Sequence, residues 1–320
     1  MKNFWRDLPR PFYILAPMED VTDAAFRTLI ARNAAPTVSR VFYTEFTSAD
    51  GLVRAPEEGK RKLLKKLEFG ESERPIVAQL FTSKPEHMEA ASALCASLGF
   101  DGIDINMGCP DRAVEKQGCG AALIRNPAQA RELIRAAQKG AGERPVSVKT
   151  RIGYDRDELD TWLPELLAEE PALVAIHART RKEMSDVPAR WEHIAHAVRI
   201  RDSLGSHTLI AGNGDIRDLA DARAKVAETR CDGVMLGRAV FGNPWLFAER
   251  RDAPTPEEKR KALIEHIELF QKHMSGFTSD ALMKRHFKAY ISGWDGAAHL
   301  RVSLMEAPSL DHAKRLLAEA

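Results

Sequence analysis

Eight short β-rich runs that alternate with helical stretches constrain the fold of this chain more than any other feature of its sequence. The runs cover residues 12–16, 41–46, 75–81, 102–106, 145–151, 173–177, 208–211 and 233–236, and helical patterns lie between them. This alternation requires a parallel sheet with right-handed crossovers, and eight such units predict an α/β fold closed into a (β/α)8 TIM barrel. The alternative, a doubly wound sheet, normally has a Gly-x-Gly-x-x-Gly turn after an early strand, and the sequence has none there.

The pattern changes after about residue 250. A linker with two prolines, residues 251–256, is followed by apolar residues at helical spacing, such as Leu263, Ile267 and Phe270, and no further strand-like run occurs. We therefore expect a barrel domain over residues 1–250 and a small helical bundle over residues 255–320.

Composition excludes several classes of protein. Hydrophobic residues make up 44% of the chain, which is enough for a large core and excludes a disordered protein. The net charge is only +1, so binding of nucleic acid would depend on a local basic patch. The four cysteines form no CxxC pair, which argues against a zinc site or a disulfide framework, and no metal is expected. No apolar run is long enough to cross a membrane, so we expect a soluble, cytoplasmic protein.

Residues 104–110 carry the most chemical information. The apolar, alternating run from Gly102 to Asn106 stops at Gly108-Cys109-Pro110, which predicts a strand that ends in a tight turn, because Pro110 cannot donate a further ladder hydrogen bond. Cys109 would then lie at the C-terminal end of a strand, where α/β barrels bind their ligands. A buried cysteine is more often a small hydrophobic residue. From this context alone, a chemical and a structural role for Cys109 are equally supported.

The other predicted strand ends also carry polar or turn-forming residues. They are Ala16-Pro17-Met18, Glu45, Gln79, Lys149 with Arg151, His177 with Arg179, Asn213-Gly214-Asp215, and Gly237-Arg238. The glycine loops after the seventh and eighth strands favour a phosphate site, which many TIM barrels have at this place. A carboxylate beside a phosphate is unfavourable, so Asp215 is expected to point away or to cap the following helix. His177 is as often a core histidine as a catalytic one.

The Asn-x-Gly-Cys-Pro turn, with Gly118-Cys119-Gly120 shortly after it, resembles the tRNA-dihydrouridine synthases, which are flavin enzymes that reduce a uracil ring in RNA. The resemblance covers nearly the whole chain. It implies an FMN-dependent, NADPH-driven oxidoreductase that converts uridine to 5,6-dihydrouridine in tRNA, with hydride passing from flavin N5 to uracil C6 and Cys109 protonating C5. It also implies that the C-terminal bundle holds the tRNA and that the protein is a monomer.

The resemblance also implies roles for individual residues. The expected FMN contacts are Ala16, Pro17, Met18, Gln79, Lys149, His177, Asn213, Gly214, Asp215, Gly237 and Arg238. A fixed cation such as Lys149 would favour the reduced flavin anion. Asn106 and Arg179 are expected to bind the substrate. A cysteine with its ordinary pKa of about 8.5 is mostly protonated at neutral pH, as an acid must be. The sequence departs from the family pattern at three positions. Ala178 and Asp215 stand where many members have glycine, and Cys119 lies in a segment that usually holds small residues.

Local basic clusters are the candidate RNA contacts. Lys284, Arg285 and Lys288 lie in the expected bundle, and Arg181 and Lys182 follow the sixth predicted strand. Residues 60–66 are also basic, although such a run is more often a solvated helix face. Contacts with phosphates would make RNA binding sensitive to salt.

Other functions stay open. A flavin barrel dehydrogenase of a free pyrimidine or another small molecule would share the barrel and the phosphate loops, but it would not need residues 255–320. A non-catalytic RNA-binding protein with a degenerate barrel would purify without a coloured flavin. A phosphosugar isomerase or aldolase has no use for the Cys109 turn.

Overall fold

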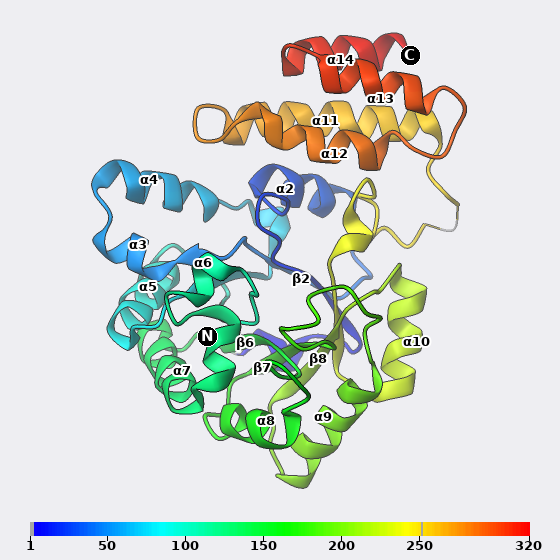
Figure 1. Cartoon of the computed structure of the whole chain (residues 1–320). Coiled ribbons are helices and arrows are strands. Elements are labelled where there is room, and N and C mark those ends of the chain that lie inside the picture. Colours follow the sequence, from blue (N-terminus) through cyan, green and yellow to red (C-terminus); the bar gives the residue numbers. More distant parts are fainter. Residues whose placement is uncertain (1–2, 251) are drawn as a thin grey trace.

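The computed structural model describes residues 3–250 and 252–320, and a closed barrel forms its centre (Figure 1). The strands of the ring are β1 (Phe12–Leu15), β2 (Arg40–Tyr43), β4 (Ile76–Phe81), β5 (Gly102–Met107), β6 (Val146–Arg151), β7 (Leu173–His177), β8 (Leu209–Asn213) and β9 (Gly233–Leu236). Each pairs in parallel with the next, and β9 pairs with β1 to close the ring. Every predicted run forms a strand, and the predicted TIM barrel is confirmed.

Helices connect the strands and surround the barrel (Figure 1). They are α2 (Ala24–Asn33), α3 (Ala49–Arg54), α4 (Glu57–Lys66), α5 (Pro85–Ser97), α6 (Arg112–Glu115), α7 (Pro127–Ala141), α8 (Leu159–Leu167), α9 (Glu192–Ser203) and α10 (Leu219–Thr229). Side-chain caps begin several of them; Asp23 accepts a hydrogen bond from the Phe26 amide at the start of α2, as the N-cap preference of aspartate predicts.

The second strand is shorter than predicted. The sequence predicts one strand over residues 41–46, but β2 ends at Tyr43, and a two-residue strand, β3 (Thr47–Ser48), resumes pairing with β4. Thr44 causes the break, because its hydroxyl, rather than a backbone carbonyl, accepts the amide of Gln79 at 3.1 Å. A side-chain acceptor can replace one bond of a ladder but cannot continue it.

The barrel interior changes from apolar to polar towards its C-terminal end. At the N-terminal end, the short helix α1 (Phe4–Asp7) closes the barrel with Trp5, whose ring lies 5.3 Å from that of Phe12 and is 1% exposed. Above this layer a hydrogen-bonded chain of buried side chains runs along the axis through Tyr43, Ser147, Asp104, Gln79 and Asn106. Burial raises the pKa of Asp104 to about 6.

The predicted helical bundle follows the barrel. It consists of α11 (Pro256–Met274), α12 (Lys284–Tyr290), α13 (Ala297–Glu306) and α14 (Leu310–Glu319), which lie above α2 in Figure 1. Thr255 and Glu258 form a capping box that starts α11. Phe26 of α2 stacks on His266 of α11 with ring centroids 4.6 Å apart. The buried side chains of the barrel exterior and of the bundle form one continuous core.

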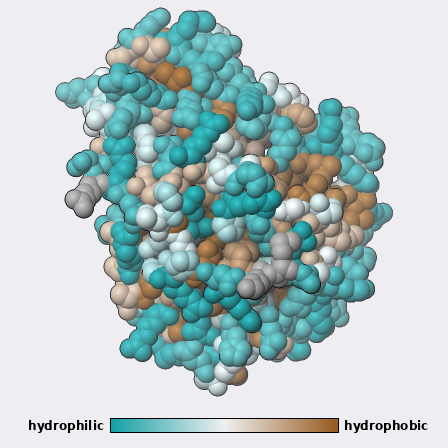
Figure 2. All heavy atoms as spheres, turned by 180° about the vertical axis from the view of Figure 1, so that it is seen from behind, coloured by the Kyte–Doolittle hydropathy of each residue, from teal (hydrophilic) through white to brown (hydrophobic). Residues whose placement is uncertain are grey.

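The surface carries small apolar patches within a mostly hydrophilic cover (Figure 2). Large apolar side chains that are well exposed include Leu204 on the barrel and Val302 and Met305 on α13. Within residues 3–250 and 252–320, every helix is too short or too polar to span a bilayer.

Candidate active site

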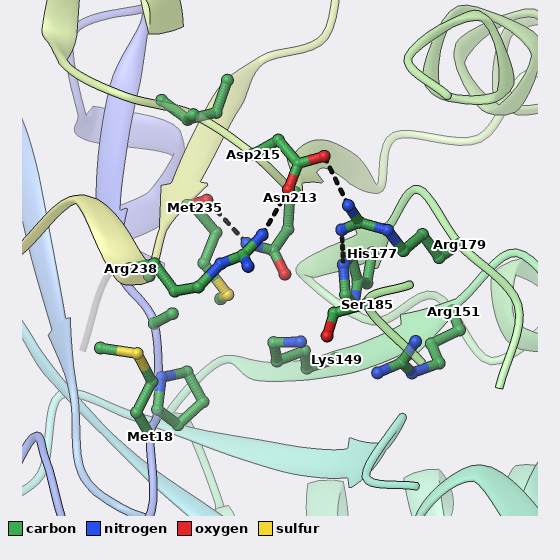
Figure 3. A pocket seen from close by; sticks show the side chains of 15 residues that line it. Met18, Lys149, Arg151, His177, Arg179, Ser185, Asn213, Asp215, Met235 and Arg238 are labelled. Atoms are coloured by element: carbon green, nitrogen blue, oxygen red, sulfur yellow. Dashed lines mark hydrogen bonds and ion pairs between the residues drawn. The ribbon is translucent and has the colours of Figure 1, made fainter. Parts of the chain in front are cut away.

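The parallel register brings the polar strand ends together at the C-terminal mouth of the barrel. Arg151 on β6 lies beside His177 on β7, His177 beside Asn213 on β8, and Asn213 beside Met235 on β9. These residues line a cavity of about 280 Å³ (Figure 3). Its other lining residues are Ala16, Pro17, Met18, Lys149, Arg179, Ser185, Gly214, Asp215, Ile216, Gly237 and Arg238. Most of the expected cofactor contacts therefore converge on one site.

The cavity is strongly cationic. The Lys149 side chain extends into it (Figure 3) and forms no hydrogen bond or ion pair with another described residue. Burial and the neighbouring Arg151 lower the pKa of Lys149 to about 8, and burial lowers the pKa of Arg151 to about 10. An enclosed cation without a partner is costly, which favours an anionic ligand at this place.

His177 is uncharged in this setting. Burial and the surrounding cations, Lys149 foremost, lower its pKa well below the usual value. The guanidinium of Arg179 lies 3.0 Å from Nε2 of His177, and because arginine can only donate, this ring nitrogen accepts. A neutral His177 with its remaining proton on Nδ1 therefore orients Arg179 in the cavity wall.

Asp215 corrects one expectation. Its carboxylate neither points away nor caps a helix, since Asp218 caps α10. Instead, it lies 2.5 Å from the guanidinium of Arg179 and 2.5 Å from that of Arg238 (Figure 3). It also accepts the amide of Ala189 at 2.8 Å. Burial raises the pKa of Asp215, but the hydrogen bond from Arg179 and the charges of both arginines outweigh it and hold this pKa below its usual value. The carboxylate joins two arginines across the cavity.

Gly214 is required by the geometry of the same loop. Its φ of +128° is unfavourable for any residue with a side chain. A Cβ atom there would also lie 2.7 Å from Cβ of Ala189 and 3.2 Å from Cδ2 of His177. The glycine therefore lets the loop pack directly against the histidine.

Cys109 lies on a turn beside this cavity rather than among the residues that line it. Burial raises the pKa of its thiol, although Lys149 and Arg151 are close enough to act in the opposite direction. Gly120, at φ +61°, packs against the turn, because a Cβ atom there would lie 2.7 Å from the Cys109 carbonyl oxygen. The second thiol nearby, Cys119, is 1% exposed, and burial raises its pKa to about 11.

Two expected contacts lie beneath the cavity. Gln79 is fully buried and bonds to Asp104 at 2.8 Å and to Asn106 at 3.1 Å. The amide oxygen of Asn106 accepts the backbone amides of Gly108 and Cys109. Asn106 therefore supports the turn that carries Cys109, and Gln79 supports Asn106.

The side chains expected to contact RNA differ in their exposure and in their bonds to other residues. Lys182 and Lys288 are exposed, whereas Arg181 forms an ion pair with Glu115. Lys284 donates to the Met305 carbonyl at 2.7 Å. Arg285 lies 3.0 Å from Asp20 in the loop after β1. A shallow groove of about 540 Å³ between α12 and α13 is lined by Lys284, Arg285, Lys288, Ala298, Arg301, Val302, Met305 and Glu306.

A carboxylate cluster near the cavity already contains a cation. Oxygen atoms of Glu19, Asp20 and Glu45 lie within 4.8 Å of one another. Lys66 of α4 forms an ion pair with Glu19 and also interacts with Glu45, whose pKa burial raises to about 7. Lys66 therefore already compensates part of the negative charge of this cluster.

Four residues that line the cavity were given no binding or catalytic role from the sequence. Arg151 and Met235 lie at predicted strand ends, so their position was a usable signal. Ser185 and Ile216 lie in the loops after β7 and β8, and no pattern in the sequence singles them out.

A closed (β/α)8 barrel with a cationic cavity and a fixed thiol at its C-terminal mouth is the architecture of a TIM-barrel enzyme. Residues 14–320 match the family described as dihydrouridine synthase (Dus). The probable tRNA-dihydrouridine synthase of Staphylococcus aureus (strain COL) is 42% identical over 323 residues, which cover 99% of this chain and 95% of the relative. Probable tRNA-dihydrouridine synthase 2 of Bacillus subtilis (strain 168) is 42% identical over 318 residues, which cover 99% and 96%. This chain belongs to the dihydrouridine synthase family, and it is an oxidoreductase.

Solved structures with low identity share only the fold. A 2-naphthoyl-CoA reductase is 12% identical with a TM-score of 0.53, and the match covers 73% of this chain and 49% of that chain. Histamine dehydrogenase from Rhizobium sp. 4-9 is also 12% identical with a TM-score of 0.53, and its match covers 82% and 49%. The family expected from the Cys109 turn is thus confirmed by sequence, and the barrel by structure.

Proposed function

We propose that this protein reduces uridine to 5,6-dihydrouridine in tRNA, with FMN as its cofactor, NADPH as the reductant and Cys109 as the proton donor. The observation that carries the proposal is the position of Cys109, a thiol on a hydrogen-bonded turn beside a cationic cavity of the family barrel. The names of the Staphylococcus and Bacillus relatives support tRNA as the substrate.

The cavity fits a cofactor with one aromatic end and one anionic end. Ala16, Pro17 and Met18 provide an apolar wall, and a methionine sulfur packs favourably against an aromatic ring. Lys149 and Arg238 provide cations that would hold a phosphate or a flavin anion. When bound, FMN would accept hydride from NADPH and pass it to uracil C6.

Cys109 would supply the proton that completes the reduction at uracil C5. Burial raises the pKa of the thiol, so the proton stays on Sγ at neutral pH. After transfer, the thiolate would be stabilised by Lys149 and Arg151, which interact with it electrostatically. Hydride and proton together saturate one carbon–carbon double bond, and a proton from water restores the thiol.

RNA would be held by local patches, because the net charge of the whole chain is only +1. Lys182 stands beside the catalytic mouth, and Lys284, Arg285 and Lys288 border the groove on α12 and α13. The extrusion of one uridine from the RNA would bring its base to the cavity at a cost of a few kcal/mol.

The test is nucleoside mass spectrometry of unmodified tRNA incubated with the purified protein and NADPH. We expect a uridine that gains the mass of two hydrogen atoms, and no gain when NADPH is omitted. A yellow protein that produces no gain would favour the small-molecule flavin dehydrogenase. A colourless protein without activity would favour the non-catalytic RNA-binding protein.

A further inference from the structure

The backbone around Cys109 is fixed from below by one side chain. Asn106 Oδ1 accepts the amide of Gly108 at 3.2 Å and that of Cys109 at 2.9 Å. The amide of Ala121 donates to the Cys109 carbonyl at 2.9 Å. Both polar groups of the Cys109 backbone are therefore bonded, which limits its rotation.

Two arginines fix the carbonyls on either side of the cysteine. Nε of Arg151 donates to the Gly108 carbonyl at 2.8 Å, and Nη2 of Arg181 donates to the Pro110 carbonyl at 3.3 Å. Arg151 comes from β6 and Arg181 from the loop after β7, so two other parts of the barrel hold the turn after β5. A charged donor to a carbonyl is stronger than a neutral one.

Arg181 is itself held in place by the segment that follows the turn. Its Nε lies 2.9 Å from both carboxylate oxygens of Glu115, and its Nη2 also bonds to that carboxylate. Glu115 belongs to α6, which begins three residues after Cys109. The side chains of Arg181 and Glu115 are only 21% and 11% exposed. A bidentate pair of low exposure has the fixed geometry that an isolated surface ion pair lacks.

The surroundings of Arg181 restrict it further. Its guanidinium lies 5.5 Å from the ring centroid of Tyr154, and Arg125 lies 3.6 Å from the same centroid. Its backbone amide donates to the Gly153 carbonyl at 2.9 Å. To reach an RNA phosphate, the guanidinium would have to leave Glu115 and the Pro110 carbonyl. Lys182, the next residue, is exposed; its backbone amide donates to the Tyr154 carbonyl at 2.9 Å, but its side chain forms no hydrogen bond or ion pair with another described residue.

We propose that Arg181 is a positioning residue, which together with Glu115 holds the Cys109 turn so that the thiol faces the substrate ring. This role replaces the RNA contact expected from the sequence, and it rests on the proposed function of Cys109. Arg181 acts only through the turn: it donates to Pro110 and Glu115, while the proton comes from Cys109.

The decisive variant is Arg181→Lys, because it keeps the positive charge and loses the forked geometry. At equal FMN content, we expect the rate of dihydrouridine formation with saturating tRNA to fall by about tenfold or more, as for a small misplacement of a reacting group. We expect the Kd for tRNA to stay within about twofold, because the Arg181 guanidinium is bonded to Glu115 and to the Pro110 carbonyl and so does not contact a phosphate. Alkylation of Cys109 by iodoacetamide, followed by peptide mass spectrometry, is expected to become faster as the turn loosens.

Lys182→Met is the matched contrast. If Lys182 contacts a phosphate, its loss weakens tRNA binding and lowers the salt slope of log K by about one. It is expected to leave the alkylation rate of Cys109 unchanged, because the side chain has no bond to the turn. Glu115→Gln, which keeps an acceptor for Arg181 without its charge, is expected to lie between wild type and Arg181→Lys in both rate and alkylation.

The results separate the possible explanations. Wild-type turnover and wild-type Cys109 alkylation in Arg181→Lys would overturn the positioning role. Weaker tRNA binding with unchanged turnover of bound tRNA would return Arg181 to the RNA contacts. If wild-type protein formed no dihydrouridine, the proposed function would fail, while the alkylation rates would still test the turn. If Arg181→Lys did not fold, Glu115→Gln would carry the same comparison.

Discussion

The carboxylate of Asp215 lies 2.5 Å from the guanidinium of Arg179, within a cavity whose other charged side chains are cations. The same carboxylate pairs with Arg238, and Asp215 adopts a φ of +56°, which is uncommon for a residue other than glycine. A carboxylate in a site suited to phosphate reduces the positive charge available to the ligand. If the proposed FMN binds in this cavity, the pair sets how strongly its phosphate is attracted.

Asp215→Asn is expected to tighten binding of FMN by about tenfold at low salt, because it removes a negative charge from the wall of the cavity proposed to hold the phosphate. Riboflavin, which lacks the phosphate, is the control ligand, and its affinity should change little. Fluorescence titration of the apoprotein measures both. Weaker FMN binding would mean that Asp215 acts mainly by holding Arg179 and Arg238 in position.

Asp215→Asn should also lower the stability of the apoprotein. The Arg179 side chain is only 3% exposed and would lose its charged partner, at a cost of about 1–3 kcal/mol. Urea denaturation of the apoprotein measures this change. Addition of FMN should recover stability with the logarithm of the ligand concentration, by about 1.4 kcal/mol for each tenfold increase above the Kd.

Lys149 should make cofactor binding depend on pH. Burial lowers its pKa to about 8, so the ammonium group is charged below that pH and neutral above it. A bound anion needs the charged form, so the affinity for FMN should fall as the pH rises above about 8. Lys149→Met should bind FMN more weakly at pH 7 and show no such decline between pH 8 and 10. A decline of equal size in both proteins would assign it to another group.

Cys109→Ala should slow dihydrouridine formation by about 10²–10⁴-fold, the usual contribution of a positioned acid. FMN content, read from the visible absorbance, should stay the same because Cys109 does not line the cavity. Cys119→Ala is the matched control for a thiol in the same loop. A Cys109→Ala enzyme with wild-type turnover would remove the cysteine from the chemistry.

The interface between α2 and the bundle should weaken in acid. His266 and His286 are 0% and 2% exposed, with ring centroids 4.5 Å apart. Burial, with a smaller effect of Arg285, lowers the pKa of His286 to about 4. Burial, with a smaller effect of His286, lowers the pKa of His266 well below its usual value. Between pH 6.5 and 4 the unfolded chain therefore binds more protons, and stability falls as the pH falls.

The expected slope is up to about 1.4 kcal/mol per pH unit for each histidine. Urea midpoints between pH 7 and pH 5 measure it. His286→Phe should reduce the slope by about one proton, whereas His299→Gln on the exposed face of α13 should leave it unchanged. An unchanged slope in His286→Phe would place the titrating groups elsewhere.

Lys288→Met should weaken tRNA binding without changing the chemistry at the barrel mouth. Lys288 is exposed on α12 at the edge of the groove, so its loss should reduce the salt slope of log K by about one. Filter binding at several salt concentrations measures the slope. A slope equal to that of wild type would exclude Lys288 from the phosphate contacts.

The sequence predicted the barrel and the place of the site because both depend on local patterns. Strand runs of alternating character give the ring, and parallel pairing then brings the strand ends to one edge. Lys149, His177 and Asn213 could therefore be assigned to one cavity before their distances were known. The break after Tyr43 could not be predicted, because it depends on one hydrogen bond from the Gln79 amide to the Thr44 hydroxyl.

The charged partners were beyond the reach of sequence patterns. Arg181 and Glu115 are 66 residues apart, and neither position predicts the other. From the sequence, the Asp215 carboxylate was expected to be unfavourable beside a phosphate. Its two arginine partners come from the loops after β7 and β9, so the sequence does not show that its charge is compensated. Such pairs are determined by how loops from different strands meet, so only the folded chain reveals which cations are free.

Helix α2 packs against the barrel on one side and against α11 on the other, where Phe26 stacks on His266 and Arg32 pairs with Glu265. A chain cut after residue 250 would expose that apolar side of α2 to water and would be prone to aggregate. Loss of activity in such a truncated protein would report misfolding and could not distinguish a tRNA enzyme from a small-molecule dehydrogenase. Point substitutions on the outer face of the bundle, which leave the α2 interface intact, test the role of the bundle without this complication.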